Sequence, residues 1–543
     1  MTPPGYTITE KIVESGYTAV YRALSPTSQP VILKVLQPTQ ATPQGLARFR
    51  REYEITHQLT GSEMIQTYGL ESFQNSLAMV LEDFGGHSLS QLLKQPLPTE
   101  TFLPLALRIV EQLDAIHQQN LIHKDINPAN IVWNRETNIV KIIDFGLSTS
   151  LSRENSDMRS PHLLEGTLAY ISPEQTGRMN RAIDYRSDYY ALGASFYQLL
   201  IGQPPFSGQD PLELVHAHIA RMPPSPHTLN PSIPYPLSEI VLLLLAKNAE
   251  DRYQSAYGLK SDLSECLRQW QVNGRITPFP LAQHDVSSLF QLPQKLYGRD
   301  AESETLLTAF SRTADPAQGG VELLLVTGSA GVGKSSLVRE LHKAITIQRG
   351  YFISGKFDQL HRTPYTALIH AFQELINQLL TESESRIAAW RSQLSAALGQ
   401  NAQVIIEVIP AIEWIMGPQP TPLLLPPAEA EARFTLAFQN FIRVFAQADH
   451  PLVLFLDDWQ WMDAGSRQLL QRLITAPHTR HLLLVGAYRD AEIGQNHPVW
   501  QMVNSLHQSH TPLNNITLAP LPLPTINQYV ADALYTTGTK TRP

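Results

Sequence analysis

The sequence is poor in cysteine and has no excess of positive charge. Cys266 is the only cysteine among 543 residues, so no disulfide can form within the chain, and a reducing compartment fits this composition. Lysine and arginine number 41 against 49 aspartates and glutamates, which leaves a net charge of −8 at pH 7. This balance argues against a nucleic acid or an anionic membrane surface as the main partner.

Long apolar runs and a secretion signal are also missing. The aliphatic run at 240–246, IVLLLLA, is far shorter than the ~20 residues that a membrane-spanning helix needs. The first residues, MTPPGYTITEK, lack the basic and then apolar order of a signal peptide. The sequence therefore predicts a cytoplasmic protein without a membrane span and without a nucleic-acid partner.

What is present is enough apolar material for several cores, since 43% of the residues are hydrophobic. In the first block of the chain, residues 1–271, strand-like segments at 31–36 and 77–84 come first. Helical segments such as 105–119 follow, with apolar residues at three-to-four spacing. Strands followed by helices predict a two-lobed α+β fold.

The second block, residues 297–543, alternates short buried-strand runs with helices. Such runs occur at 322–326, 451–458 and 481–488. This alternation predicts an α/β fold with a parallel sheet covered by helices. Between the blocks, residues 272–296 contain glycine, proline and serine without a sustained period, which predicts a linker.

The segment LIHKDINPANIVWN, residues 121–134, has the residue types that phosphoryl transfer requires. A carboxylate must accept the proton of the attacking hydroxyl, and oxygen ligands for Mg²⁺ must lie close to it. Asp125 is the candidate base, and Asn130 is a candidate metal ligand. The strand-like segment VKIIDFGLS contains Asp144, the second candidate metal ligand.

Lys34 stands within an apolar strand, VILKVL, and an acidic partner is available on the helix that follows. Glu52 is the expected partner, because Glu54 projects about 200° away around the same helix. The pair would hold the lysine on the α and β phosphates of ATP.

Several of these residues, with a downstream acidic and basic pair, occur in the order typical of one family. They are Lys34, Glu52, Asp125, Asn130, Asp144, Glu174, Asp188 and Arg252. Residues 6–271 thereby resemble a serine/threonine protein kinase domain. The resemblance implies that Glu82, after the gatekeeper Leu81, marks the hinge that binds the nucleotide. Glu174 and Arg252 are expected to form a buried pair with a structural role.

The nucleotide loop, EKIVESGYTAVYRAL, departs from the family pattern G-x-G-x-x-G-x-V. With Val20 as the valine, the glycine positions hold Val13, Ser15 and Thr18, and Gly16 stands one place off. Glycines matter there because a Cβ would obstruct the approach of phosphate to the backbone N–H groups. Ser15, Gly16 and Thr18 are small and uncharged, so the loop is expected to bind ATP and the kinase to be active.

Three further positions bear on phosphotransfer. The resemblance places Lys124 where the family has arginine, and Asn127 where it has a lysine near the γ-phosphate; Asn127 can donate a hydrogen bond but carries no charge. Thr167, just before the expected substrate groove, supports serine or threonine as the acceptor. Candidate phosphorylation sites in the activation loop are Ser150, Ser152, Ser156 and Ser160.

The second block contains a phosphate-binding motif. LLLVTGSAGVGKSSLVRELHKAI, residues 323–345, matches G-x-x-x-x-G-K-[ST] after a strand and at the start of a helix. Lys334 is expected to bridge the β and γ phosphates, and Ser335 to bind Mg²⁺. The predicted nucleotide-binding residues of the motif are Gly328, Gly331, Gly333, Lys334, Ser335 and Ser336.

Acidic residues follow a later strand, PLVLFLDD. Asp457 is expected in the Mg²⁺ shell, and Asp458 is expected to orient the attacking water. Arg489, after the strand at 481–488, is expected near the γ-phosphate. Lys356 follows another strand, and the sequence assigns it no role.

Residues 297–515 resemble the STAND-type signalling ATPases related to AAA+ proteins, which act as nucleotide-dependent switches and often self-associate. The order of the two blocks is similar to the N-terminal half of cyanobacterial proteins in which sensor and histidine-kinase domains follow. This sequence contains no counterpart of the helical lid of those proteins. The chain is therefore expected to be either a natural short form or a truncated one.

Together, the resemblances imply an ATP- and Mg²⁺-dependent protein serine/threonine kinase, with protein substrates and a fused ATPase unit that regulates it. The alternative is a pseudokinase scaffold, an interaction protein whose only turnover is ATP hydrolysis at Lys334. The altered nucleotide loop and Asn127 favour this alternative.

Overall fold

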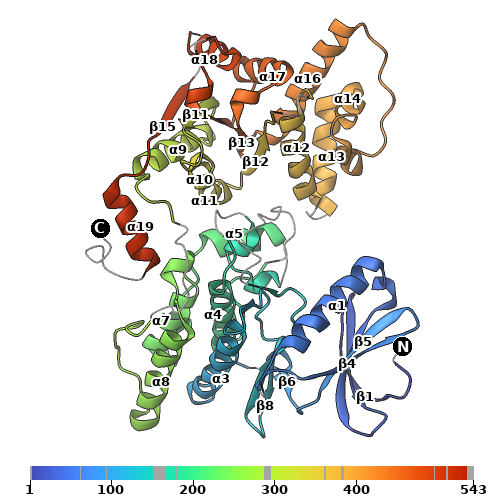
Figure 1. Cartoon of the computed structure of the whole chain (residues 1–543), viewed down its shortest axis with the longest axis vertical. Coiled ribbons are helices and arrows are strands. Elements are labelled where there is room, and N and C mark those ends of the chain that lie inside the picture. Colours follow the sequence, from blue (N-terminus) through green and yellow to red (C-terminus); the bar gives the residue numbers. More distant parts are fainter. Residues whose placement is uncertain are drawn as a thin grey trace. The chain divides into compact units, whose positions relative to one another are not determined.

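In the computed structural model, the chain forms two compact units (Figure 1). The first contains residues 1–176, 182–209 and 221–289, and the second contains residues 177–181, 210–220 and 290–543. Within these bounds the structure describes residues 3–61, 63–92, 95–150, 167–177, 182–208, 210–285, 295–359, 363–380, 384–494, 496–508 and 512–534.

An antiparallel sheet of five strands begins the first unit, in the order β1-β2-β3-β5-β4 (Figure 1, blue). Side chains alternate between its faces. Leu33 and Val35 pack on one face, whereas Leu36 contacts Phe49 of helix α1 on the other. Lys34 therefore faces α1. The elements are β1 (Thr7–Glu14), β2 (Thr18–Leu24), β3 (Pro30–Leu36), α1 (Pro43–Gln58), β4 (Thr67–Phe73) and β5 (Ser76–Glu82).

Helices build the rest of the first unit around a separate core. The apolar residues of α3 recur at three-to-four spacing, and Phe102, Ile109 and Ile116 are fully buried. Two small sheets, β6-β8-β9 and β7-β10, carry the loops next to them. The helices are α2 (Leu89–Leu92), α3 (Thr99–His117), α4 (Arg186–Ile201), α6 (Pro226–Leu229), α7 (Tyr235–Leu244) and α8 (Ala256–Asn273). The strands are β6 (His87–Ser88), β7 (Leu121–Ile122), β8 (Ile131–Asn134), β9 (Ile139–Ile142) and β10 (Thr149–Ser150).

Part of the predicted linker packs against the first unit. Ile276 is buried in the helical core. The Asp285 carboxylate accepts the Gln254 N–H at 2.6 Å and the Ser255 hydroxyl at 2.7 Å. Residues up to 285 thus have the contacts of a folded segment, although the sequence predicted a linker from 272. The domain bounds themselves stay predictions.

A parallel sheet of five strands, in the order β12-β13-β14-β11-β15, forms the centre of the second unit (Figure 1). Its middle strands are buried, because helices cover both faces. The carboxyl ends of β11, β13 and β14 lie along one edge, where α/β folds bind ligands. The strands are β11 (Val321–Gly328), β12 (Tyr351–Lys356), β13 (Leu452–Asp457), β14 (Leu482–Tyr488) and β15 (Leu513–Leu518).

Two hydrophobic cores lie on opposite faces of this sheet. One includes side chains of α12, α13, α16 and α17, and the other those of α9, α10 and α11. The helices of the unit are α5 (Pro211–Ala220), α9 (Asp300–Thr313), α10 (Lys334–Arg339), α11 (Leu341–Ile347), α12 (Thr366–Leu379), α13 (Glu384–Leu398), α14 (Ala402–Ile406), α15 (Glu413–Met416), α16 (Pro427–Phe445), α17 (Ala464–Thr475), α18 (Pro498–Gln508) and α19 (Leu523–Ala533).

Both predicted fold classes are confirmed: a two-lobed α+β unit and an α/β unit with a parallel sheet. Among the described helices, none combines the length and the apolar character required to cross a membrane.

Candidate active sites

An ion-pair cluster joins three of the predicted residues of the first unit. The Lys34 ammonium lies 2.6 Å from Glu52 Oε1 and 3.0 Å from Asp144 Oδ2. Burial alone would lower the pKa of Lys34, but the two carboxylates outweigh it and raise the pKa above its ordinary value. Lys34 is therefore a permanent cation next to Asp144. A fixed positive charge in this position is suited to bind phosphate oxygens.

Asp125 lies in the loop between β7 and β8, and neighbouring amides hold its carboxylate. Oδ1 accepts the Thr167 N–H at 2.9 Å, and Oδ2 accepts a hydrogen bond from Asn130 Nδ2 at 2.9 Å. Asn127 Nδ2 donates to the Asp125 carbonyl at 3.1 Å and to Thr167 Oγ1 at 3.3 Å. Asn127 thus keeps a bridge between the candidate base and Thr167 without adding charge.

Asp188 holds the backbone of this loop in place by hydrogen bonds. Its carboxylate accepts the N–H groups of His123 and Lys124, each at 2.8 Å, and it also lies 2.8 Å from Nε2 of His117. All four residues are buried. His117 was not singled out from the sequence, because a histidine 71 residues from its partner carries no local pattern.

Three of the non-glycine residues with left-handed backbone lie at these sites. Lys124 has φ of 69°, Asp144 has φ of 72°, and Asp458 in the second unit has φ of 54°. Residues other than glycine rarely adopt such φ angles. These angles persist where the surrounding structure enforces them, often at functional positions.

Glu82 ends β5 at the predicted hinge. Its N–H is donated to the Gln66 carbonyl at 3.0 Å, and its carboxylate binds the Gln66 N–H and the buried Lys141 ammonium. The Lys141 ammonium also donates to the Met64 carbonyl at 2.8 Å. The N–H of Glu82 is therefore engaged, and the residue ties the hinge to neighbouring segments.

The nucleotide loop is folded by its own serine. Ser15 Oγ accepts the N–H groups of Tyr17 at 3.3 Å and Thr18 at 3.0 Å. Val13 is 54% exposed at the end of β1, and Gly16 is exposed with open space around it. Val20 pairs with Lys34 across β2 and β3, so the loop adjoins the ion-pair cluster.

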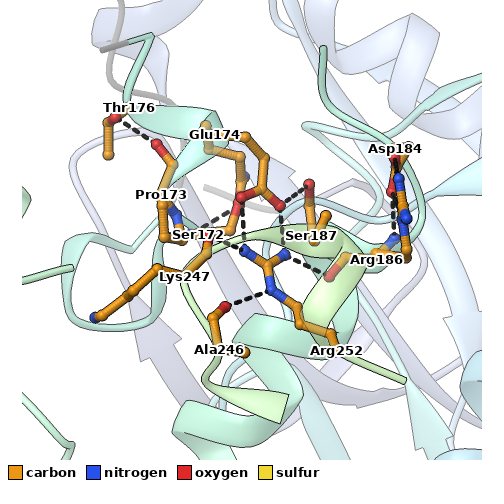
Figure 2. Close-up of polar contacts among 12 residues, drawn as sticks. Ser172, Pro173, Glu174, Thr176, Asp184, Arg186, Ser187, Ala246, Lys247 and Arg252 are labelled. Carbon is orange, nitrogen blue, oxygen red and sulfur yellow. Dashed lines mark hydrogen bonds and ion pairs between the residues drawn. The ribbon is translucent and has the colours of Figure 1, made fainter. Parts of the chain in front are cut away.

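A buried ion pair holds the segment after Thr167 (Figure 2). Arg252 donates to both oxygens of Glu174, at 2.6 and 2.8 Å, and Ser187 adds a hydrogen bond at 2.7 Å. Burial alone would raise the pKa of Glu174, but the guanidinium outweighs it and holds that pKa at about 2. The remaining Arg252 donors bind the carbonyls of Ala246, Lys247 and Arg186.

Breaking this pair is expected to destabilise the first unit. Arg252→Met leaves the Glu174 carboxylate buried and unpaired, which costs about 3–5 kcal/mol at pH 7. Because the folded pKa of Glu174 lies below its unfolded value, the pair stabilises above about pH 4.5, and this contribution is lost as the pH falls toward 2. The measurement is urea unfolding at pH 7 and at pH 4. Arg268→Met is the matched control, because its equally short pair with Glu265 is exposed; equal losses in both variants would contradict the prediction.

The phosphate-binding motif of the second unit has the backbone that its glycines predict. Gly331 and Gly333 have φ of 76° and 98°, and a Cβ on either would meet no atom within 4 Å. Gly328 lies against the Leu518 carbonyl, where a Cβ would come within 2.7 Å. The loop is thus an open turn, and α10 follows it with Lys334, Ser335 and Ser336.

The polar residues of this motif meet the end of β13. Ser335 Oγ donates to Asp457 Oδ2 at 2.9 Å, although the two are 122 residues apart. The Lys334 ammonium donates to the carbonyls of Gly328 and Ser329 at 2.8 and 2.9 Å, and burial lowers its pKa. The lysine therefore lies folded over the turn that is expected to hold phosphate.

Asp458 lies between two cations. Its carboxylate is 3.3 Å from Lys356 Nζ and 3.8 Å from Arg489 Nε, and Gln460 donates to it at 2.8 Å. Arg489 also pairs with Glu492 at 2.9 Å. The structure thus brings Lys356, which the sequence left without a role, to the residue expected to orient water.

Lys356→Met is expected to raise ATP hydrolysis by about two- to fivefold. Only the lysine end of this ion pair is exposed, and such a pair is worth about 1 kcal/mol; if Asp458 orients water, the ammonium would compete with that water for Oδ2. The measurement is phosphate release under saturating ATP, with the exposed Lys343→Met on α11 as control. A tenfold fall in Lys356→Met would show instead that the lysine assists the reaction.

Both sites have donor sets that fit Mg²⁺. Asn130 and Asp144 in the first unit, and Ser335 and Asp457 in the second, offer the oxygen ligands that Mg²⁺ prefers. Within the described part of the chain, no cluster of three or more histidine, cysteine or acidic side chains could hold a metal ion by itself. In proteins, Mg²⁺ is commonly bound by one or two carboxylates together with nucleotide phosphates.

The folds and the positions of these residues are those of a protein kinase domain joined to a P-loop NTPase domain. The family model for the protein kinase domain matches residues 6–285, and that for the AAA ATPase domain matches residues 295–485. The chain therefore belongs to the protein kinase family and carries a fused AAA ATPase domain.

Three relatives are similar to this chain over part of its length. Hybrid signal transduction histidine kinase G of Dictyostelium discoideum is 34% identical, over 69% of this chain and 13% of its own length. Histidine protein kinase 1 of Candida albicans is 24% identical, over 69% of this chain and 17% of its own length. Serine/threonine-protein kinase PknB of Mycobacterium leprae is 32% identical, over 43% of this chain and 38% of its own length. The chain thus spans less than a fifth of the length of the first two relatives.

Proposed function

We propose that the first unit is an ATP-dependent protein kinase that transfers the γ-phosphate to serine or threonine hydroxyls of proteins. The observation that carries the proposal is the joint geometry of Lys34 and Asp125. Lys34 is paired with Glu52 and Asp144, while the Asp125 carboxylate is oriented by the amides of Thr167 and Asn130.

In this proposal each residue has a defined task. Lys34 binds the α and β phosphates, and Asp125 accepts the proton of the attacking hydroxyl. A bond forms between that oxygen and the γ-phosphorus while the bond to the β-phosphate oxygen breaks, and ADP leaves. Asn130 and Asp144 would hold Mg²⁺, which neutralises charge on the phosphates when bound. Relatives named as serine/threonine kinases support the choice of acceptor.

For the second unit we propose ATP binding and hydrolysis that regulate the kinase. Lys334 would reach the β and γ phosphates from the turn formed by Gly328, Gly331 and Gly333. Ser335 and Asp457 would hold Mg²⁺, and Asp458 would orient the attacking water. We also propose that this unit self-associates and that the protein acts in the cytoplasm. The linker was predicted at 272–296, and because residues up to 285 pack against the first unit, we propose that the first domain extends to residue 285.

The test is label transfer from γ-labelled ATP by the full chain, with Mg²⁺ and a basic acceptor protein. Acid hydrolysis of the product is expected to yield labelled serine or threonine. Absence of label while ATP still binds to the first unit would overturn the kinase proposal.

One observation favours the second candidate, a pseudokinase scaffold. The Ser15 hydroxyl occupies the N–H groups of Tyr17 and Thr18, which a kinase loop would offer to phosphate. In that case all ATP turnover would depend on Lys334, and the first unit would act by binding a nucleotide or a protein.

A further inference from the structure

Tyr17, at the turn between β1 and β2, reaches from the nucleotide loop to helix α1. Its hydroxyl donates to the Gly45 carbonyl at 3.0 Å, in the first turn of the helix. The Arg48 guanidinium lies 5.0 Å from the centre of its ring, a cation–π contact from the next turn. The Tyr17 carbonyl accepts the Gln37 N–H at 2.9 Å, so both ends of the residue are held.

The acceptor at Gly45 is fixed in place. Thr42 caps α1 by accepting the Gly45 N–H at 3.1 Å. A Cβ on Gly45 would lie 2.0 Å from the Gln40 carbonyl oxygen, so the close turn requires glycine there. Tyr17 is thus bonded to a rigid point of the helix.

The same helix carries Glu52, whose carboxylate holds Lys34 at 2.6 Å. Lys34 in turn pairs with Val20 across β2 and β3, and Val20 ends the nucleotide loop. The contacts therefore form a closed ring that runs from the loop through α1 and the ion pair and back to the loop. A shift of α1 that broke the Lys34–Glu52 pair would also pull on Tyr17.

We propose that Tyr17 is a positioning residue that couples the nucleotide loop to helix α1, so that the loop is set to receive ATP when the Lys34–Glu52 pair is formed. This inference rests on the first unit binding ATP, as in the proposed function, and it adds a means of regulation. Any partner or modification that moves α1 would change the ATP affinity through Tyr17.

The coupling through Tyr17 matters because the nucleotide loop contains few glycines. A loop with three glycines can fold around phosphate after binding, whereas this loop holds only Gly16 and is folded in advance by Ser15. An interaction that holds such a loop in place raises affinity by reducing the cost of ordering it. Burial raises the pKa of the Tyr17 phenol, so the hydroxyl keeps its proton at neutral pH.

The test is equilibrium dialysis of labelled ATP against the full chain carrying Lys334→Ala, which silences the second nucleotide site. Tyr17→Phe keeps the ring on Arg48 and removes the bond to Gly45, and it is expected to raise Kd about three- to tenfold. Tyr68→Phe is the matched control, because Tyr68 is 60% exposed on β4 and its hydroxyl has no hydrogen bond to any described residue. It is expected to leave Kd unchanged.

A double variant separates coupling from a merely local role. In a chain with Glu52→Gln, adding Tyr17→Phe is expected to change Kd less than twofold, because the helix no longer positions Lys34. The same full-size effect in both backgrounds, no effect of Tyr17→Phe alone, or no ATP binding to the first unit would each overturn the inference. Coupled binding without phosphotransfer would overturn only the kinase proposal, and phosphotransfer with unchanged ATP affinity in Tyr17→Phe would overturn only the coupling.

Discussion

Asp125→Asn is expected to reduce phosphotransfer to serine or threonine about a thousandfold while ATP still binds. The carboxylate is the proposed acceptor of the hydroxyl proton, and general bases typically contribute about 10²–10⁴-fold. Asparagine retains an oxygen for the Thr167 N–H, but its amide would face the Asn130 amide, which now donates to Oδ2 at 2.9 Å. The measurement is the initial rate of label transfer at saturating γ-labelled ATP.

Two comparisons make the result specific to the base. Asp114→Asn replaces a carboxylate on the outside of α3, where it accepts a hydrogen bond from Gln118, and it is expected to keep full activity. Thermal unfolding of Asp125→Asn should match the parent chain within a few degrees. A variant that folded and retained more than a tenth of the rate would show that another group accepts the proton.

Much of both sites could be predicted because the residues lie where regular elements end or follow a helical period. The choice of Glu52 over Glu54 rested only on helix geometry, and Lys34 lies 2.6 Å from Glu52. Ser335 comes shortly after β11 and Asp457 ends β13, and parallel strands bring their carboxyl ends together whatever the distance in sequence. Predicted chemical roles remain proposals, but the proximity of these side chains follows from the folds.

The remaining features depend on contacts that no local pattern encodes. The approach of Lys356 to Asp458 follows from the placement of β12 next to β13, and strand order is not written in the period of either segment. The capping of the loop by Ser15 depends on backbone angles at a turn. Likewise, the Pro- and Gly-containing segment before Asp285 was predicted as linker, whereas side-chain hydrogen bonds fix it to the start of α8.

The candidate phosphorylation sites cannot be compared with the structure. Ser152, Ser156 and Ser160, the candidate phosphorylation sites, lie outside the described residues, as does the side chain of Ser150. The Thr167 N–H donates a hydrogen bond to the candidate base, Asp125, and thereby connects the end of the activation segment to the catalytic loop.

Lys334→Ala is expected to reduce ATP hydrolysis by on the order of a hundredfold or more, while phosphotransfer by the first unit continues. The lysine supplies a positive charge to the β and γ phosphates as negative charge shifts between them, and loss of one such donor costs about 10²–10³-fold. In the present structure its ammonium is bound by the Gly328 and Ser329 carbonyls, so phosphate must draw it out of the turn. Phosphate release without acceptor protein measures this step, and Lys343→Ala on the exposed face of α11 is the control.

The paired readout distinguishes the two proposed activities of the chain. Because the two sites have separate lysines, Lys334→Ala should remove hydrolysis without removing label transfer, and Asp125→Asn should do the reverse. Retained hydrolysis in Lys334→Ala would refute the second unit as the ATPase. Loss of both activities in Lys334→Ala, in a chain that is still folded, would contradict this expectation and would mean that the kinase requires nucleotide binding in the second unit.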